Sequence, residues 1–374
     1  MKLADFAVRI WDICTHTPLM SGRPFRWIII ANPKAGGFTI PSRWRRHYCA
    51  LTEYAVKAKT LSRRDNAVPL RTAMDEGKDD SLGDLGLIPT RFAGHAGKIT
   101  EILLKEAAAE LSSGAPSKPF YLIICAGGDG TSLEVQSVLC NAAPEIRENF
   151  AVIRVPMGTG NDGADAREVA GALDLLLHPS RIEPARAVRL TTATAGKGPF
   201  LAFNILSVGL DAFVTHMTNK MKGNLPGDFY KLWVDIASLL YDRLYTVGPL
   251  DIRVFNDTEP EGKVLRETAL LMAVGASGHR TYGSNKRILP DDRNVCIVRQ
   301  MSLLRKLTLK GLFTTGAHVN KPESLLFNAA RVEFRGEYPI LAQMDGESVL
   351  LQPEDFPAVI ELTEPVIPVL KKIN

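Results

Sequence analysis

The stretch FYLIICAGGDGT, residues 120–131, decides the fold class of this chain. Its first half is an apolar run typical of a buried strand, and residues 132–140 have the composition of a helix. The glycines Gly127, Gly128 and Gly130 let the backbone approach a ligand closely. The amino end of the following helix offers unpaired N–H groups and a partial positive charge. The stretch therefore predicts a phosphate-binding loop between a strand and a helix, with Asp129 in its middle.

Strands and helices alternate through the first part of the sequence. Apolar runs at 27–31 and 151–155 are further strand candidates, and helix-like segments lie at 42–61 and 97–112. Such alternation is typical of a parallel sheet with helices on both faces. We also expect a weak strand at 85–89 and a surface loop or insertion at 63–83.

The later part of the sequence is rich in short, β-branched segments. Strand candidates lie at 187–191, 200–205, 250–255, 269–274, 295–298 and 332–335. A long helix, about Asp228 to Tyr245, interrupts them. We therefore expect an α/β domain over residues 1–170 and a β-rich domain over residues 171–359.

Composition places the chain among ordinary globular proteins. It has 374 residues, of which 45% are hydrophobic and 23% charged, with a net charge of +4. No run of Lys or Arg indicates nucleic acid, and no apolar segment is long enough to span a bilayer. Five scattered cysteines indicate a reducing, cytoplasmic setting. Residues 3–14 have an apolar helical face, which we expect to dock on its own domain rather than on a membrane.

Four loops follow the apolar strands of the first domain, at 32–36, 90–96, 127–131 and 156–163. In open α/β sheets, ligands bind beyond the carboxyl ends of the strands, so these loops are expected to converge. Taken alone, the Asn32 loop is typical of an ordinary strand-to-helix turn. Thr90 alone is typical of a helix cap.

The glycine run at 127–131 is not a Walker A loop, because no Lys-Ser/Thr pair ends it. Phosphate charge would then be met by Mg²⁺ and by backbone N–H groups. Asp129 is well suited to position Mg²⁺, which prefers oxygen ligands. The loop at 156–163 matches the glycine spacing of the dinucleotide fingerprint, but Pro156 breaks the preceding strand, and we reject that match.

Together these motifs resemble the diacylglycerol kinase catalytic-domain family, which includes bacterial lipid kinases and sphingosine and ceramide kinases. The matching segments are Asn32-Pro33 with Gly36, Gly127–Thr131 with Glu134-Val135, Pro156–Asp162, Asn204 with Gly209–Ala212, and Asp345-Gly346-Glu347. The resemblance spans about residues 27–370. It implies a parallel-sheet, NAD-kinase-like nucleotide-binding domain, a β-sandwich lipid domain, ATP bound between the domains, and a return of residues 360–374 to the first domain.

The resemblance also implies roles for individual residues. The nucleotide contacts would be Asn32, Pro33, Lys34, Gly36, Thr90, Gly127, Gly128, Asp129, Gly130, Thr131, Gly158, Thr159, Gly160, Asn161 and Asp162. Asp345, Glu347 and Asp129 would be catalytic, with Asp345 as the base that takes the proton of the acceptor hydroxyl. By itself, Asp345-Gly346 is typical of a plain hairpin turn. Asp129 would hold Mg²⁺, and Asp292, in a shortened turn at 289–293, would hold a structural Mg²⁺.

The implied function is an ATP- and Mg²⁺-dependent lipid kinase acting on diacylglycerol or a related lipid. Its partner would be the lipid substrate at the membrane surface, so the protein would be cytoplasmic and peripherally membrane-associated. The sequence leaves open whether the chain forms a homodimer. One alternative is an NAD kinase-like phosphotransferase, which Leu133 fits slightly better but the loop at 158–162 disfavours. The other is a catalytically silent lipid- or nucleotide-binding regulator, against which the retained acids Asp129 and Asp345 argue.

Overall fold

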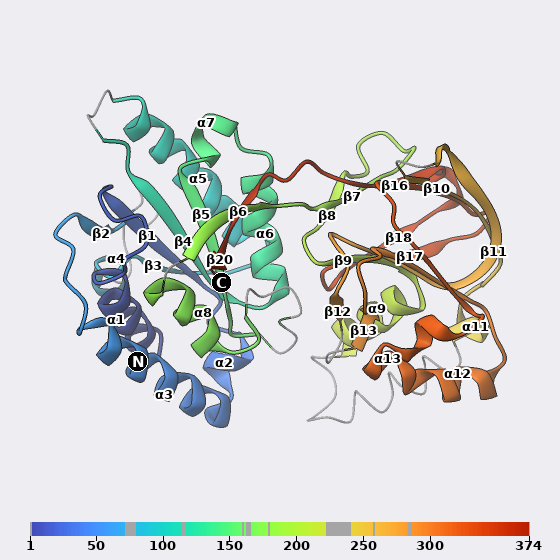
Figure 1. Cartoon of the computed structure of the whole chain (residues 1–374), viewed down its shortest axis with the longest axis horizontal. Coiled ribbons are helices and arrows are strands. Elements are labelled where there is room, and N and C mark those ends of the chain that lie inside the picture. The colour runs from blue at the N-terminus through green and yellow to red at the C-terminus, as the bar shows by residue number, and fades with distance from the viewer. Residues whose placement is uncertain are drawn as a thin grey trace. The chain divides into compact units, whose positions relative to one another are not determined.

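The computed structural model describes residues 2–71, 80–113, 117–158, 161, 166–178, 180–221, 241–256, 259–282 and 286–373. The chain forms two compact units (Figure 1). Unit 1 comprises residues 1–185 and 366–374, and unit 2 comprises residues 186–365. Both boundaries lie later in the sequence than 170 and 359, because the segment at 180–185 pairs with the C-terminal strand inside unit 1.

Unit 1 is built on a seven-stranded, mostly parallel sheet. Its strands are β1 (Phe25–Ala31), β2 (Ala67–Pro69), β3 (Leu87–Pro89), β4 (Phe120–Gly127), β5 (Phe150–Pro156), β6 (Ser180–Ala185) and β20 (Ile367–Lys372). The order is β2-β1-β4-β5-β20-β6, with β3 also on β1, and only β6 runs antiparallel to its neighbour. The expected parallel sheet is confirmed.

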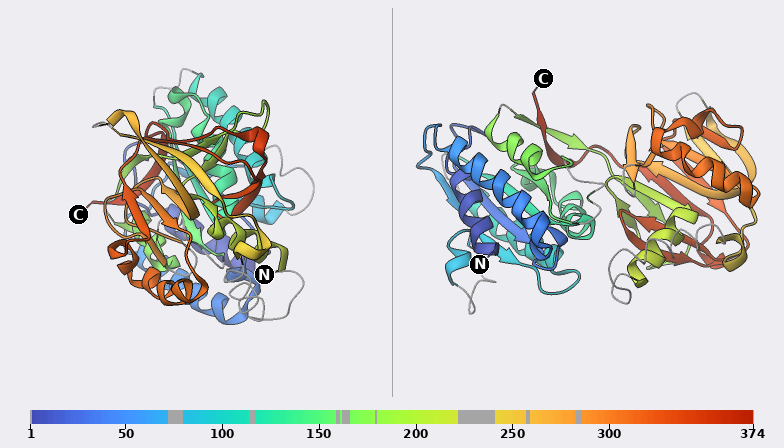
Figure 2. Two further views of the ribbon diagram at one scale, coloured as in Figure 1. Left: turned by 90° about the vertical axis from the view of Figure 1, so that its right-hand side faces the viewer. Right: turned by 90° about the horizontal axis from the view of Figure 1, so that it is seen from below.

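Helices cover both faces of this sheet (Figure 1, Figure 2). They are α1 (Lys2–Cys14), α2 (Gly36–Thr39), α3 (Pro41–Ala58), α4 (Asp80–Gly83), α5 (His95–Leu111), α6 (Asp129–Cys140), α7 (Pro144–Arg147) and α8 (Val169–Leu177). Helices α1, α3 and α8 pack together on one face, and α5 and α6 pack together on the other.

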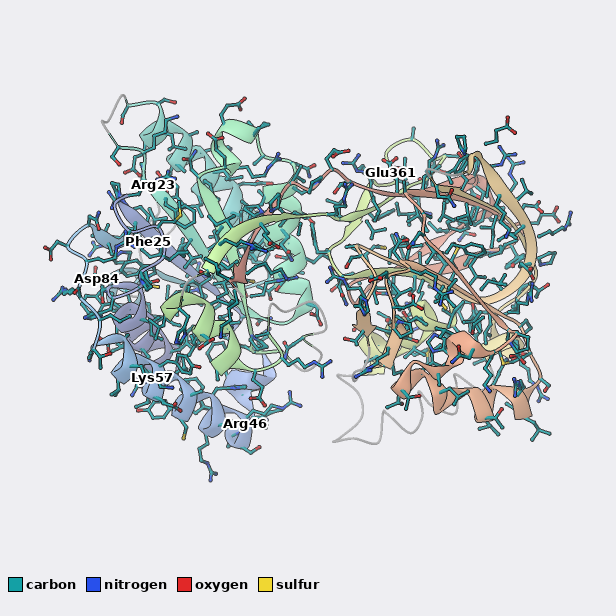
Figure 3. All side chains as sticks on the ribbon, viewed as in Figure 1. Arg23, Phe25, Arg46, Lys57, Asp84 and Glu361 are labelled. Atoms are coloured by element: carbon teal, nitrogen blue, oxygen red, sulfur yellow. The ribbon has the colours of Figure 1, made fainter. Side chains whose placement is uncertain are left out.

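The core of unit 1 is formed by the apolar runs that predict its strands. Phe25, labelled in Figure 3, stacks on Phe120 of the neighbouring strand with ring centroids 6.1 Å apart. Phe6 and Ile10 of α1 are fully buried in the same cluster. The apolar face of the N-terminal helix therefore docks on its own domain, as expected.

The segment at 63–83 corrects one expectation. Instead of a surface loop alone, it contributes β2, whose Ala67 lies opposite Phe25 in parallel register, and the short helix α4. A three-residue strand is too short to produce a periodic pattern in the sequence.

Unit 2 is an antiparallel, β-sandwich-like domain, as expected. Its strands are β7 (Val188–Thr191), β8 (Phe200–Ala202), β9 (Ile205–Gly209), β10 (Pro249–Asn256), β11 (Glu259–Gly275), β12 (Arg280–Tyr282), β13 (Lys286–Leu289), β14 (Val295–Arg299), β15 (Ser324–Phe327), β16 (Arg331–Arg335), β17 (Ile340–Met344), β18 (Glu347–Leu351) and β19 (Ala358–Leu362). The 17-residue strand β11 joins the two parts of the large sheet by pairing with β10 along its first half and with β9 and β14 along its second.

Short helices flank the strands of unit 2. They are α9 (Leu210–Met221), α11 (Tyr241–Leu244), α12 (Leu303–Lys310), α13 (Leu312–Thr315), and the 3₁₀ turns η2 (Ala317–Asn320) and η3 (Pro353–Asp355). Of the long helix expected at 228–245, only α11 falls within the described residues. No helix in the described part of the chain is both long enough and apolar enough to span a bilayer.

The strand expected at 200–205 is interrupted. Strand β8 ends at Ala202 and β9 begins at Ile205, so Phe203 and Asn204 leave the ladder. Their N–H groups bind a carboxylate from a distant hairpin instead, and this hairpin is part of the candidate site.

Candidate functional site

The four loops singled out in the sequence meet at one edge of the unit 1 sheet. Backbone hydrogen bonds run from Thr90 N to Ala31 O (2.7 Å), from Asn32 N to Ala126 O (2.9 Å), and from Met157 N to Gly127 O (3.0 Å). The loops after β3, β1, β4 and β5 are therefore neighbours. They form one cluster at the carboxyl ends of parallel strands, where ligands bind in open α/β sheets.

The first loop is closed by the side chain of Asn32. Its Oδ1 accepts a hydrogen bond from Lys34 N at 3.0 Å, which fixes the turn at Pro33. Lys34 itself is exposed. Just beyond Gly36, where α2 begins, Gly37 N donates to Met157 O at 2.7 Å and ties this loop to the loop after β5.

The glycine run connects β4 to α6 as the sequence predicts. Gly128 is the N-cap of α6, and the first N–H groups of a helix have no acceptor within it. Asp129 and Gly130 are partly exposed, whereas Thr131 is buried beneath the loop. A β-carbon on Gly127 would stand only 2.6 Å from Thr131 Oγ1, so glycine is needed there for packing. Gly128, Asp129 and Gly130 thus form the accessible part of the run.

The loop after β5 lies directly against the glycine run. A β-carbon on Gly158 would lie 2.5 Å from the Cα of Gly128, so the two backbones touch. Asn161 adopts a left-handed conformation (φ 58°), and its side chain bonds both N and O of Gly158, at 2.8 and 3.0 Å. Thr159, Gly160 and Asp162 lie outside the described residues.

Glu134 has a structural role that sequence reasoning did not assign. From the second turn of α6, its carboxylate accepts hydrogen bonds from Gly94 N (2.7 Å), Ala96 N (2.9 Å) and Gly97 N (3.4 Å). These N–H groups form the amino end of α5, where a negative charge is favourable. Glu134 therefore fixes the loop that carries Thr90 to the helix behind the glycine run. The only indication of this role in the sequence was the position of Glu134 in the matching segment Gly127–Thr131 with Glu134-Val135.

The unit 1 cluster fits Mg²⁺ complexed to a phosphate. Asp129 offers a hard oxygen donor at the same helix end that offers N–H groups to an anion. Where the structure describes the chain, no three His, Cys, Asp or Glu side chains gather as a metal cage. A single carboxylate is sufficient when phosphate oxygens and water complete the coordination of Mg²⁺.

In unit 2, Asp345 and Gly346 form the turn between β17 and β18. Both have positive φ, 46° and 99°, as the two central residues of a type I′ hairpin turn require. The expected hairpin turn is confirmed. Its next residue, Glu347, is exposed at the start of β18.

The carboxylate of Asp345 lies against the break between β8 and β9. Oδ2 accepts from Phe203 N (2.5 Å) and Asn204 N (3.1 Å), and Oδ1 accepts from Asn204 N (3.1 Å) and Ile205 N (3.0 Å). These hydrogen bonds hold the turn against the strand break. Asp345 thus has a structural function in addition to the catalytic one that the resemblance implies.

A buried polar network supports this turn, and it also went unpredicted. Asp211, only 6% exposed, lies at the start of α9 and accepts from Ser207 Oγ (2.5 Å) and Gln343 Nε2 (3.2 Å). Gln343 Oε1 in turn accepts from Gly346 N at 3.0 Å. Burial raises the pKa of Asp211 to about 6, although Ser207, Lys286 and Gln343 oppose the shift.

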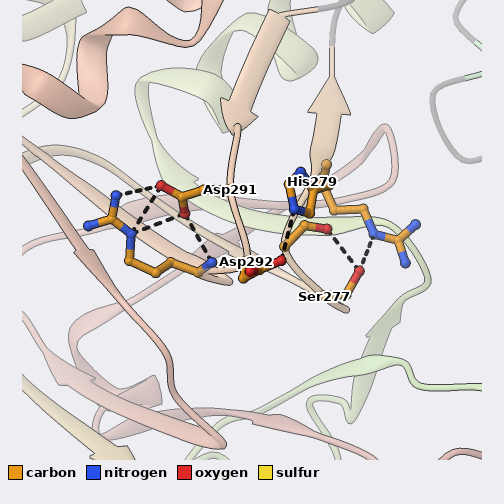
Figure 4. A network of polar contacts seen from close by, with 7 residues as sticks. Ser277, His279, Asp291 and Asp292 are labelled. Carbon is orange, nitrogen blue, oxygen red and sulfur yellow. Dashed lines mark hydrogen bonds and ion pairs between the residues drawn. The ribbon is translucent and has the colours of Figure 1, made fainter.

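The turn at 289–293 is held by ion pairs within the protein (Figure 4). Asp291 binds Arg293, whose hydrogen bonds lower the pKa of Asp291. Asp292, 96% exposed, lies 2.9 Å from His279 Nε2. Asp292 as a metal ligand stays a prediction.

Comparisons with known proteins support the resemblance. Residues 26–191 match the family model "Diacylglycerol kinase catalytic domain", and residues 204–369 match "YegS C-terminal NAD kinase beta sandwich-like domain". Among solved structures, the chain is similar to a "putative diacylglycerol kinase" from Bacillus anthracis str. Sterne. One such structure has a TM-score of 0.55 and 19% identity, covering 93% of this chain and 97% of the other. A second has a TM-score of 0.53 and 18% identity, covering 92% and 96%. No curated protein matches.

Proposed function

Because this chain belongs to the diacylglycerol kinase catalytic-domain family, we propose that it is an ATP- and Mg²⁺-dependent lipid kinase that phosphorylates a hydroxyl of diacylglycerol or a related lipid. The family supports a phosphotransferase of the kinase type. The nucleotide, the metal and the lipid acceptor belong to our proposal.

One observation carries the proposal: the backbone contact between Gly128 and Gly158 at the carboxyl edge of the unit 1 sheet. It holds two glycine-rich loops together beside the amino end of α6. Such a surface offers backbone N–H groups and positive helix-end potential to an anion without a Walker lysine. A nucleoside triphosphate requires such a surface when Mg²⁺ neutralises the rest of its negative charge.

In this proposal, the residues of unit 1 bind and orient the nucleotide. The N–H groups at Asp129 and Gly130 would donate hydrogen bonds to phosphate oxygens, and the Asp129 carboxylate would hold Mg²⁺ or its water ligands. The Asn32 loop and Thr90 would border the same site. The bound nucleotide would supply the phosphoryl group, and catalysis would rest mainly on positioning and charge neutralisation.

The residues of unit 2 would act on the acceptor. Asp345 would accept a hydrogen bond from the acceptor hydroxyl and take its proton late in the reaction. A loose transition state requires little basicity of the proton acceptor, so a carboxylate that also accepts backbone N–H bonds can serve. Glu347, which is exposed two residues later, would be a second carboxylate near that hydroxyl.

The proposal is tested by the fate of the labelled γ-phosphate. Pure protein would be incubated with γ-labelled ATP and Mg²⁺ and, separately, with mixed lipids and with NAD. Label in the organic phase supports a lipid kinase, whereas label in NAD would identify an NAD kinase-like phosphotransferase. ATP binding without transfer to either acceptor would favour a silent regulator and overturn the proposal.

A further inference from the structure

Three leucines of helix α12 face outward, whereas Lys306 of the same helix faces inward. Leu303, Leu304 and Leu307 are 44%, 77% and 49% exposed, whereas Lys306 on the same helix is 7% exposed. A surface helix of a globular domain normally shows the opposite polarity, with its apolar stripe facing the core. These three leucines therefore contribute little to the core of unit 2.

Ion pairs hold the helix in this orientation. Lys306 Nζ lies 2.9 Å from a carboxylate oxygen of Asp242 on α11. Arg305 makes two hydrogen bonds to Glu323, at 2.6 and 3.1 Å. Because the neighbouring residues are anchored, the leucines are presented to solvent by a fixed helix rather than by a fraying segment.

Exposed apolar side chains of unit 2 concentrate at this place. In the described part of unit 2, six large apolar side chains are exposed, and four of them lie on α11 and α12: Leu244, Leu303, Leu304 and Leu307. The other two, Val264 and Leu350, lie on separate strands. Isolated exposed apolar residues are ordinary, but a cluster on one element indicates a contact surface.

The charge of the sequence around α12 indicates what kind of partner this leucine surface contacts. From Arg293 to Pro322, with Arg293 included, the chain has six Lys or Arg residues and no Asp or Glu. Arg299 and Arg305 keep side-chain exposures of 41% and 39% despite their carboxylate partners. Leucines bordered by basic groups suit the boundary between the acyl chains and the anionic headgroups of a bilayer.

We propose that Leu303, Leu304 and Leu307 insert into the headgroup region of a bilayer that contains anionic lipids, and that α12 docks unit 2 on the membrane. The inference rests on the proposed function, because an enzyme whose acceptor resides in a bilayer must reach it there. It adds the surface by which the bilayer is contacted.

Vesicle binding by the full chain tests this docking without ATP. The probes are vesicles of phosphatidylcholine alone and of phosphatidylcholine with phosphatidylglycerol. Binding to them is measured by sedimentation. The test variant is L303Q/L304Q/L307Q, and the control is V56Q/V264Q, whose valines are 63% and 66% exposed elsewhere. The wild type and the control should bind the anionic vesicles, and the test variant should bind about tenfold more weakly or worse. Added salt should weaken wild-type binding.

Two results would overturn the docking surface. One is equal vesicle binding by the wild type and the test variant. The other is no vesicle binding by the wild type together with a dimer, seen by sedimentation velocity, that the leucine substitutions dissolve.

Activity measurements distinguish a failure of membrane docking from a failure of the proposed function. The test variant should phosphorylate a dispersed short-chain diacylglycerol at the wild-type rate and lose activity on vesicle-embedded diacylglycerol. Equal activity of wild type and variant on vesicles would contradict docking through α12. Absence of transfer by either protein would overturn the proposed function, while vesicle binding would still decide the docking.

Discussion

The carboxylate of Glu134 on α6 accepts a hydrogen bond from the backbone N–H of Gly94 at 2.7 Å. The same carboxylate accepts a second bond from Ala96 N at 2.9 Å, at the amino end of α5. One side chain thus joins the helix that follows the glycine run to the loop that carries Thr90. If both segments bind the nucleotide, Glu134 is a positioning residue for that site.

Replacing Glu134 should therefore weaken nucleotide binding more than turnover. Glu134→Ala leaves the N–H groups of Gly94 and Ala96 without their acceptor, and we expect roughly 1–3 kcal/mol less stability. The KM for ATP should rise about tenfold with a smaller change in kcat. Glu134→Gln, which keeps one acceptor oxygen, should recover part of both losses.

The matched control is Glu101→Ala, on an exposed position of α5. It should change neither the KM for ATP nor the melting temperature. An unchanged KM in Glu134→Ala would show that the loop keeps its position without this carboxylate.

Gly158→Ala should separate the two glycine-rich loops. The added β-carbon would meet the Cα of Gly128 at 2.5 Å, a contact that forces backbone to move. We expect ATP affinity, measured by titration calorimetry, to fall by about tenfold or more. Gly311→Ala is the control, because a β-carbon there meets no atom within 4 Å. Wild-type affinity in Gly158→Ala would contradict a shared phosphate site.

Strands β1, β4 and β5 could be predicted from the sequence because buried parallel strands are continuous apolar runs. The glycine run and the Asp345-Gly346 turn could be predicted because each is local, and glycine or a turn dipeptide marks it. The break at Phe203 could not be predicted, since its cause is the carboxylate of a residue 142 positions away in the sequence. The helix-capping role of Glu134 likewise depends on a loop 40 positions earlier.

The buried network in unit 2 was missed for a similar reason. Ser207 and Gln343 look ordinary in the sequence, and Asp211 was singled out only as part of the segment Gly209–Ala212. They become a network only when α9 and strands β9 and β17 meet. The β strands themselves were predicted from alternation, which carries no information about which polar residues on different strands become neighbours.

Asp211 should make stability depend on pH. Burial raises its pKa to about 6 in the folded chain, from about 3.9 when unfolded. The protonated form therefore favours folding, and this contribution is complete below about pH 4 and is lost as the pH rises through about 6. Asp211→Asn, which keeps an acceptor for Ser207 and Gln343, should raise the free energy of unfolding at pH 7.5 by on the order of 2 kcal/mol.

Urea unfolding between pH 4 and pH 8 measures this effect. The difference between Asp211→Asn and the wild type should grow with pH and level off above about 7. Asp65→Asn, at an exposed position of unit 1, should give no such trend. A difference that does not vary with pH would mean that Asp211 does not titrate in this range.

Asp345→Asn should damage both structure and transfer. The backbone N–H groups of Phe203 and Asn204 now donate to the Asp345 carboxylate. The side-chain NH₂ group of an asparagine, itself a donor, would face them instead. We expect a lower melting temperature and a loss of lipid phosphorylation of about 10²-fold or more. Glu347→Gln leaves these bonds intact, so its melting temperature should fall less than that of Asp345→Asn, and its rate reports on the second carboxylate.

The central claim is tested most directly by the rate at which γ-labelled phosphate from ATP enters extractable lipid in the presence of Mg²⁺. The account predicts labelled lipid with the wild type and with Asp65→Ala, an exposed control in unit 1, and a loss of about 10²-fold or more with Asp129→Ala. No label in diacylglycerol or related lipids with the wild type, or an equal rate in Asp129→Ala, would contradict it.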